Sequence, residues 1–545
     1  MRNLTFMFIA VILLAACSKS SENAGLTFLK TQGQDIVNES GEKIYLRGVG
    51  LGNWLLPEGY MWKFGENGDR PRKIEKIVSD LIGNEKASDF WYNFRKNYIT
   101  EADIQRIAAL GFNSVRPALN SRLFVTEGEN PVFIDEGFLL LDSLVQWCKK
   151  HQIYVIIDMH GAPGGQTGQN IDDSPNNEPE LFMYPKNQDL LLELWMKIVN
   201  KYKDEPAVAA YNLINEPLPE RTGAAEKYKH LLVPLYERLI SEIRKVDAKH
   251  MITVEGYNWS NNWSLFEQPL DSNIFYQFHY YCWNRPDNLN SIDYFLKKRE
   301  QLNTPVWVGE TGEQGVGIYW ATTQYFETNN IGFSFWPWKK MDTQNTPYSI
   351  NKPENWDLIA EYSKGGEKPD SIIAVKAFDD LLENIKLANC EYYQDVVNAI
   401  FARIPAKIEA ENYGHLGFNK SYFVNDTSVK SNYYRTNEPV QVNLIESDEK
   451  SRTSQQYIYL QQDEWIAYNF NNLEAKKYDL KLKLSADKLP VDISISINDK
   501  PIDYQYNKEG WNEVLIGEYD FKQGGNNIKF KLKNNQLKID WLLIE

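Results

Sequence analysis

Two short segments carry side chains that could do chemistry: residues 213–217, with the sequence LINEP, and residues 308–312, with the sequence VGETG. Each is an apolar run that leads to a glutamate, Glu216 in the first and Glu310 in the second. A carboxylate at the end of a buried run is costly unless something there needs it. Two such carboxylates from separate strands suit cleavage of a glycosidic bond, in which one protonates the leaving oxygen and the other attacks the sugar carbon.

The elements that must position these glutamates form a repeating pattern. Short apolar runs alternate with longer amphipathic segments, and the runs lie at residues 44–52, 112–119, 154–160, 208–216, 252–257, 274–281, 306–310 and 332–338. Helical periodicity marks segments such as 104–110, 138–150, 190–202 and 228–246. Eight alternations predict the α/β class and a closed parallel (β/α)8 barrel, the TIM barrel.

Chemically active side chains cluster where these runs end. In a parallel barrel the C-terminal strand ends share one face and form the site. The residues that end or follow the runs, besides the two glutamates, are Trp54, Arg116, His160, Asn215, His279, Tyr281 and Trp336. His160 and His279 come from only six histidines in the chain. We therefore predict that these side chains surround Glu216 and Glu310.

The residues in these positions resemble glycoside hydrolase family 5, within a clan of retaining (β/α)8 glycosidases. The resemblance covers residues 26–363 and rests on motifs in barrel order: Arg116, Asp158-Met159-His160, Asn215-Glu216-Pro217, His279-Tyr280-Tyr281, Gly309-Glu310 and Phe335-Trp336. It implies that Glu216 is the acid/base and Glu310 the nucleophile.

The same resemblance implies supporting roles for the neighbours. Asn215 would bond the sugar 2-hydroxyl, Arg116 would keep Glu310 ionised, and Tyr281 would orient Glu310. The remaining residues would bind substrate: His160 and His279 along the reacting subsite, Trp336 as its floor, and Trp54. No cofactor is expected for catalysis.

The substrate is the least constrained part of the interpretation. Segments 51–55, 161–166 and 215–218 resemble the β-1,3-glucanase branch of the family more than its mannanase branch. A β-linked polysaccharide or oligosaccharide is therefore expected, most of all a β-glucan, with β-1,3 linkages favoured over β-1,4. Mixed-linkage glucan and mannan remain alternatives. The Gly-, Asn- and Asp-rich loop 164–185 is expected to wall off one end of the groove.

Two other functions are consistent with the sequence. One is a surface glycan-binding lipoprotein that keeps the barrel as a binding platform, although both glutamates are present. The other is a transglycosylase that uses the same two glutamates, because the outcome depends on whether water or a sugar reaches the covalent intermediate first.

A second unit is predicted at residues 404–545, after a barrel domain at 26–400. Residues 401–545 carry 19 Lys and Arg against 21 Asp and Glu, so most of the negative charge lies before them. Alternating runs separated by Asn, Asp and Gly predict antiparallel strands and a jelly-roll-like β-sandwich. Segments 408–413, 463–468 and 539–541 resemble carbohydrate-binding module family 6. That resemblance implies a structural Ca²⁺ held by Glu409, Glu411 and Asp540.

The sugar-binding aromatic pair of this second unit is left open, with five candidates: Tyr413, Tyr433, Tyr434, Trp465 and Trp511.

The N-terminus has the features of an export signal. Arg2 supplies a positive charge, residues 4–16 are apolar, and small residues precede Cys17. We predict a lipoprotein signal peptide at 1–17 with lipidation at Cys17; an ordinary secretory signal is the alternative. The mature protein would be exported, anchored at the bacterial outer membrane through this lipid alone, and monomeric. A net charge of -15 argues against nucleic-acid binding.

Overall fold

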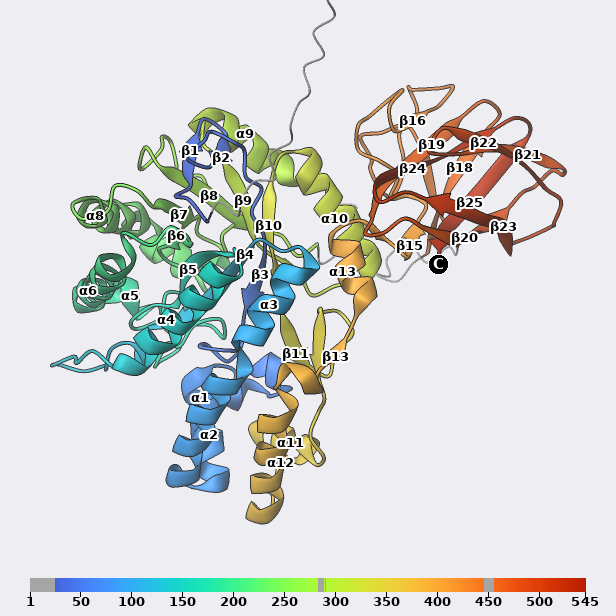
Figure 1. Ribbon diagram of the computed structural model, residues 1–545. Coiled ribbons are helices and arrows are strands. Elements are labelled where there is room, and N and C mark those ends of the chain that lie inside the picture. The colour runs from blue at the N-terminus through green and yellow to red at the C-terminus, as the bar shows by residue number, and fades with distance from the viewer. Residues whose placement is uncertain (1–24, 283–288, 290, 446–454) are drawn as a thin grey trace, which may run out of the picture.

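A computed structural model describes residues 25–282, 289, 291–445 and 455–545; residues 1–16 and Cys17, the predicted signal and lipidation site, lie outside them. Eight parallel strands close into a barrel in the order β10-β3-β4-β5-β6-β7-β8-β9 (Figure 1). Their bounds are β3 Arg47–Leu51, β4 Ser114–Asn120, β5 Tyr154–Gly161, β6 Val208–Asn212, β7 Met251–Glu255, β8 Ile274–His279, β9 Val306–Gly312 and β10 Gly332–Trp336. The predicted TIM barrel is confirmed.

Helices surround the barrel and explain why its strands are apolar runs. Nearly every strand residue is buried, because side chains fill the barrel interior on one face and the helices cover the other. The main helices are α1 Pro71–Ile82, α2 Asn84–Tyr98, α3 Glu101–Leu110, α4 Asp135–Lys150, α6 Pro185–Tyr202, α8 Leu232–Arg244, α9 Asp293–Leu302 and α10 Val316–Thr328. No helix among the described residues is long and apolar enough to span a bilayer.

The base of the barrel is closed by a short hairpin, β1 (Lys30–Gln32) and β2 (Asp35–Val37). Leu29 and Ile36 from this region join a separate core cluster with Tyr154 and Trp307 at the N-terminal strand ends. The hairpin closes the N-terminal end of the barrel, so a site can form only at the C-terminal end.

The connection to the second unit is structured throughout. In chain order it contains β11 (Lys339–Met341), β12 (Tyr348–Ile350), α11 (Trp356–Ser363), α12 (Ser371–Asn384), β13 (Glu391–Tyr392) and α13 (Gln394–Ile400), and the three strands form a small sheet. This sheet was not predicted, because strands of two or three residues are too short to show a period in the sequence.

Two six-stranded sheets follow, as the alternating runs predicted. One joins β14 (Arg403–Ile404), β19 (Trp465–Asn472), β24 (Gly524–Leu532), β21 (Val491–Ile497) and β22 (Lys500–Tyr506), with β16 (Tyr422–Phe423) on β19. The other joins β17 (Gln441–Leu444), β18 (Gln456–Gln461), β25 (Gln536–Ile544), β20 (Lys476–Ser485) and β23 (Asn512–Phe521), with β15 (Ala406–Glu409) on β25. Alternate residues of β21 are buried, which is the period of a sandwich strand.

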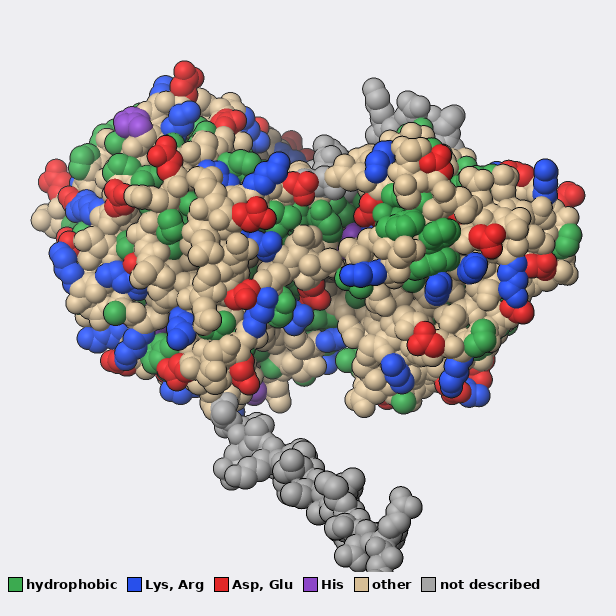
Figure 2. Space-filling view, turned by 90° about the horizontal axis from the view of Figure 1, so that it is seen from above, with side chains coloured by type: hydrophobic (Ala, Val, Ile, Leu, Met, Phe, Trp, Pro, Cys, Tyr) green, Lys and Arg blue, Asp and Glu red, His purple; other side chains and the backbone are tan. Residues whose placement is uncertain are grey.

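The sandwich packs directly on the barrel through α10 and α13, which lie between the two units (Figure 1). The Asn412 amide donates to the Gly317 carbonyl at 3.2 Å, and the rings of Tyr325 and His415 lie 5.1 Å apart. In the view from above, the two lobes meet along a broad front and mix acidic with basic side chains on their surfaces (Figure 2).

Candidate active site

A cavity of about 930 Å³ opens at the C-terminal face of the barrel. Its wall contains six of the nine residues predicted for the site, together with residues of several loops. The predicted residues on the wall are His160, Glu216, His279, Tyr281, Glu310 and Trp336. The parallel strand ends thus bring together side chains that lie far apart in sequence.

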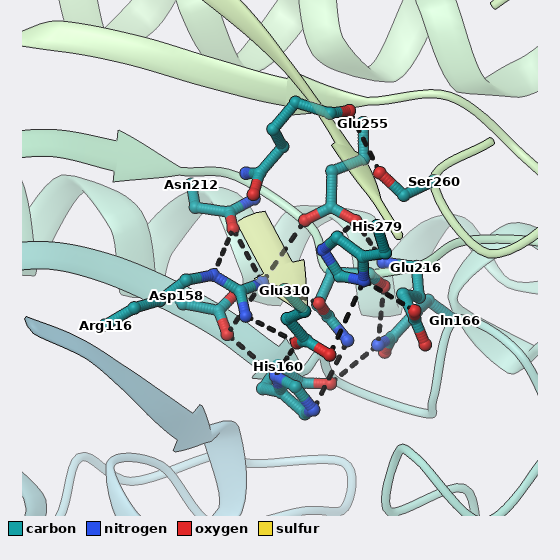
Figure 3. A network of polar contacts seen from close by, with 12 residues as sticks. Arg116, Asp158, His160, Gln166, Asn212, Glu216, Glu255, Ser260, His279 and Glu310 are labelled. Atoms are coloured by element: carbon teal, nitrogen blue, oxygen red, sulfur yellow. Dashed lines mark hydrogen bonds and ion pairs between the residues drawn. The ribbon is translucent and has the colours of Figure 1, made fainter. Parts of the chain in front are cut away.

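Glu310 lies on β9 and is held as a carboxylate (Figure 3). Arg116 Nη1 donates to its Oε1 at 2.6 Å, and the Tyr281 hydroxyl donates to its Oε2 at 2.5 Å. Burial alone would raise the pKa of Glu310, but the charges of His279 and Arg116 outweigh it and bring the pKa to about 2. Glu310 is therefore ionised at neutral pH, as a nucleophile must be.

Glu216 lies across the cavity from Glu310, on the segment that follows β6. The sequence predicted one strand through residues 208–216, but β6 ends at Asn212. The chain then turns away from the ladder, and Glu216 has a left-handed φ of 41°, which a strand cannot contain. The turn aims the Glu216 carboxyl at His279, whose Nδ1 lies 2.6 Å from Glu216 Oε1.

The two glutamates and His279 form one compact group. One carboxylate oxygen from each glutamate and one His279 ring nitrogen all lie within 4.8 Å of one another. Among the described residues this is the only such group of acidic, histidine or cysteine side chains with metal-like spacing. Burial lowers the pKa of His279, but the three surrounding carboxylates raise it overall to about 9. A protonated imidazole and the Arg116 guanidinium disfavour a cation here, so the group suits acid–base chemistry better.

Trp336 forms the floor of the cavity beside His160. The two rings are parallel within 1° with centroids 5.2 Å apart, and the Trp336 indole donates to the Tyr60 hydroxyl at 3.1 Å. A Cβ at Gly50 or Gly52 would lie 2.3 or 2.6 Å from the indole. Only glycine therefore leaves room for the ring to lie flat against β3.

Three predicted substrate-binding residues do not reach the cavity wall. Arg116 and Asn215 are fully buried behind the two glutamates, and Arg116 Nη2 donates to Asn215 Oδ1 at 2.6 Å. Arg116 thus acts on Glu310, as the resemblance implied, rather than on a sugar. Trp54 is also buried, and its indole donates to the Arg95 carbonyl of α2 at 2.7 Å. Sequence adjacency to β3 was misleading because α2 covers this side chain.

Several residues of the site were not predicted. Glu58, Tyr60 and Glu313 line the cavity, and Glu255 lies buried beneath it at the end of β7. Burial and the charge of Glu310 raise the pKa of Glu58 well above its usual range. Glu255 is the last residue of an apolar strand, and Glu310 lies near the end of another. A search for glutamates at the ends of apolar runs could therefore have found Glu255.

The loop 164–185 contributes Asn170 and Ile171 to the cavity wall. Two aspartates hold the loop in place. Asp172 accepts three backbone N–H bonds within it, at 2.7, 3.1 and 2.9 Å, and Asp173 accepts a hydrogen bond from the Arg122 side chain. The loop therefore forms part of the cavity wall.

Comparison with known proteins bears on this arrangement. Residues 75–342 match the model of the cellulase family, glycosyl hydrolase family 5. This segment holds strands β4 to β10 and both glutamates, and forms a domain of the glycosyl hydrolase family 5 type. A β-xylosidase of Phanerodontia chrysosporium is 31% identical over 241 residues, which cover 44% of this chain and 48% of that protein. A glucan 1,3-β-glucosidase of Lachancea kluyveri is 27% identical over 263 residues, which cover 46% of this chain and 58% of that protein.

The chain spans about half the length of the curated relatives it matches first. Among solved structures, a β-glucanase of Saccharophagus degradans in complex with cellotetraose aligns with 66% of this chain and 94% of its own, at 18% identity and a TM-score of 0.41. An endogalactoceramidase aligns with 94% of this chain and 100% of its own, at 14% identity and a TM-score of 0.48.

Proposed function

We propose that this family 5 domain hydrolyses β-glycosidic bonds with retention of configuration, and that its substrate is a β-glucan with β-1,3 linkages favoured. The spacing of Glu216 and Glu310 carries the proposal. Their nearest carboxylate oxygens lie within 4.8 Å, close to the separation of about 5–5.5 Å typical of retaining enzymes and below the roughly 6.5–9.5 Å of inverting ones.

The geometry supports a double displacement. Glu310, ionised and oriented by Arg116 and Tyr281, attacks the anomeric carbon while Glu216 gives its proton to the leaving oxygen. Glu216, now a carboxylate, then takes a proton from water, and that water releases the sugar from Glu310. Trp336 supplies a flat apolar surface beneath the reacting ring.

The substrate class rests on similarity to known proteins. Several relatives with 25–30% identity are named as glucan 1,3-β-glucosidases, whereas one is named as a β-xylosidase. These names support a β-linked glycan and favour the β-1,3-glucan reading that the sequence segments gave. The glycan-binding alternative is disfavoured because both glutamates are placed for reaction.

A polysaccharide panel tests the proposal. Purified protein should release reducing sugar from laminarin faster than from cellulose, mixed-linkage glucan, xylan or mannan, and Glu310→Gln should release none. Products longer than the starting oligosaccharide would assign the site to transglycosylation instead. Binding to laminarin without release of any product would support the glycan-binding alternative and refute hydrolysis.

We also propose a Ca²⁺ site in the sandwich, formed by the carboxylates of Glu409, Glu411 and Asp540. Their ligand atoms do not form a group within 4.8 Å of one another in this structure, so binding would draw the three carboxylates together. Oxygen ligands suit this cation, and Glu411 Oε2 is buried without a hydrogen-bond partner. Burial and the charge of Glu409 raise the pKa of Glu411 well above its usual range, as expected where carboxylates crowd together. Lysines partly neutralise the group: Lys407 pairs with Glu409 at 2.9 Å and Lys483 with Asp540 at 2.8 Å.

Calcium should raise the melting temperature in proportion to the logarithm of its concentration, because it would bind the native state only. Glu411→Gln should abolish this shift while leaving the barrel active. A melting temperature that does not change on chelation, in protein that elemental analysis shows to contain calcium at the start, would contradict the site.

We propose further that the chain is exported and anchored through acylated Cys17, as a monomer. Export and anchoring rest on the N-terminal sequence alone.

A further inference from the structure

Glu255 is a third carboxylate beneath the catalytic pair, and the mechanism above does not use it. It ends β7, is fully buried, and does not line the cavity. Its Oε2 accepts the backbone N–H of Glu216 at 2.8 Å. The Tyr236 hydroxyl from α8 donates to the Glu255 carbonyl at 3.0 Å, which fixes the end of this strand.

The backbone of Glu216 needs such support. A φ of 41° is rare for a residue with a side chain, and a left-handed residue of this kind costs about 1–3 kcal/mol unless its surroundings hold it. The bond from the Glu216 N–H to Glu255 Oε2 holds this conformation. It therefore also fixes the direction in which the Glu216 carboxyl leaves the backbone.

Glu255 also faces the other partner of Glu216. The imidazole of His279 lies between the two glutamates (Figure 3), with Nδ1 2.6 Å from Glu216 Oε1 and Nε2 3.5 Å from Glu255 Oε2. Glu255 is thus a counter-charge that helps His279 keep its proton. A protonated His279 stabilises the carboxylate that Glu216 becomes once its proton has moved to the leaving oxygen.

Charged groups from several other strands of the barrel surround Glu255. Arg116 Nη2 on β4 lies 3.3 Å from its Oε1, and Asp158 on β5 pairs with the same guanidinium at 3.2 Å. Burial raises the pKa of Glu255, the charges of His279 and Arg116 lower it, and the balance is about 7. On the far side of His279, Glu310 lies 3.6 Å from Nδ1.

We propose that Glu255 is the positioning residue of the acid/base: it holds the Glu216 backbone in its left-handed conformation and His279 in its protonated form, without touching substrate. This inference rests on the proposed function, because it assigns the protonating role to Glu216. It goes beyond that function by naming the group that prepares Glu216 for it.

Two substitutions separate the two parts of this role. Glu255→Gln keeps an acceptor for the Glu216 N–H but removes the charge beside His279, whereas Glu255→Ala removes both. Thr253→Val, two residues earlier on β7, is a matched control: Thr253 is buried and its hydroxyl has no partner among the described residues. Each variant is assayed on laminaritriose, which needs protonation of its leaving group, and on 2,4-dinitrophenyl β-glucoside, which does not.

Glu255→Gln should lose about 10- to 100-fold in kcat/KM on laminaritriose, a part of the 10²–10⁴-fold that a positioned acid supplies. The alkaline limb of its pH profile of kcat/KM should move to lower pH. His279 loses a negatively charged neighbour in this variant, so the pKa of its imidazole should fall. The aryl glucoside should show a much smaller loss in its glycosylation step, and Thr253→Val should match the wild type. Glu255→Ala should lose more on laminaritriose than Glu255→Gln does.

A folded Glu255→Gln protein with wild-type kinetics and an unmoved alkaline limb would overturn the inference. An equal loss on both substrates would overturn it too, since that result indicates general damage to the site. In both cases the wild type stays active and the proposed function stands. A wild type that cleaves neither compound nor any glycan of the panel would overturn the proposed function and this inference together.

Discussion

Glu216→Gln and Glu310→Gln should each abolish most turnover on polysaccharide while leaving the fold intact. An amide can neither donate the proton nor attack the sugar carbon. The loss for Glu216→Gln should be about 10²–10⁴-fold, the contribution of a positioned acid or base, and the loss for Glu310→Gln should be larger because the nucleophile itself is removed. Initial rates on laminarin and circular dichroism of each variant measure the two effects.

Azide should distinguish the two residues. With an activated aryl glucoside, a Glu216 variant should form the glycosyl-enzyme and then stall for want of a base, and azide should release a β-glycosyl azide because a small anion needs no deprotonation. Azide attacking directly in Glu310→Ala should give the α-azide through a single inversion. Near wild-type rates for both glutamine variants would contradict the assignment, and exchanged azide products would reverse it.

Arg116→Ala should damage both stability and catalysis. The guanidinium is fully buried and pairs with Glu310 at 2.6 Å, Asp158 at 3.2 Å and Glu255 at 3.3 Å. Its removal leaves buried carboxylates without a counter-charge, which typically costs about 3–5 kcal/mol of unfolding free energy. The pKa of Glu310 should rise, so the acid limb of kcat/KM should move to higher pH.

Arg116→Lys is the matched control. Lysine restores one charge but not the planar set of donors that bonds Glu310, Asn215 and Asn212 together. We expect it to recover part of the stability and little of the activity. Urea unfolding and pH–rate profiles of both variants check this. If the acid limb of the kcat/KM profile of Arg116→Ala lies at the wild-type pH, Arg116 does not keep Glu310 ionised.

The barrel and most of the cavity wall could be predicted because both follow from local pattern. Buried strands are apolar runs, and a polar side chain at the end of such a run is conspicuous. His160, Glu216, His279 and Glu310 were found in this way. Glu255 obeys the same rule but was missed, because no resemblance drew attention to it.

Other features depend on tertiary packing that the sequence does not display. Trp54 follows β3 as a substrate-binding residue would, yet it packs under α2. Asn215 is adjacent to Glu216 in sequence but lies behind it. The end of β6 at Asn212 was missed because Leu213 and Ile214 continue the apolar run. No local pattern in the sequence indicates that the sandwich packs on α10.

The anomeric form of the first product tests the central claim most directly. Proton NMR during rapid hydrolysis of laminarin, or of whichever β-glucan the enzyme cleaves best, should show the β-anomer of the product first, with the α-anomer growing in later by mutarotation. Two displacements at Glu310 require this order. Initial appearance of the α-anomer would contradict the account, because it would mean a single displacement by water and no covalent bond to Glu310.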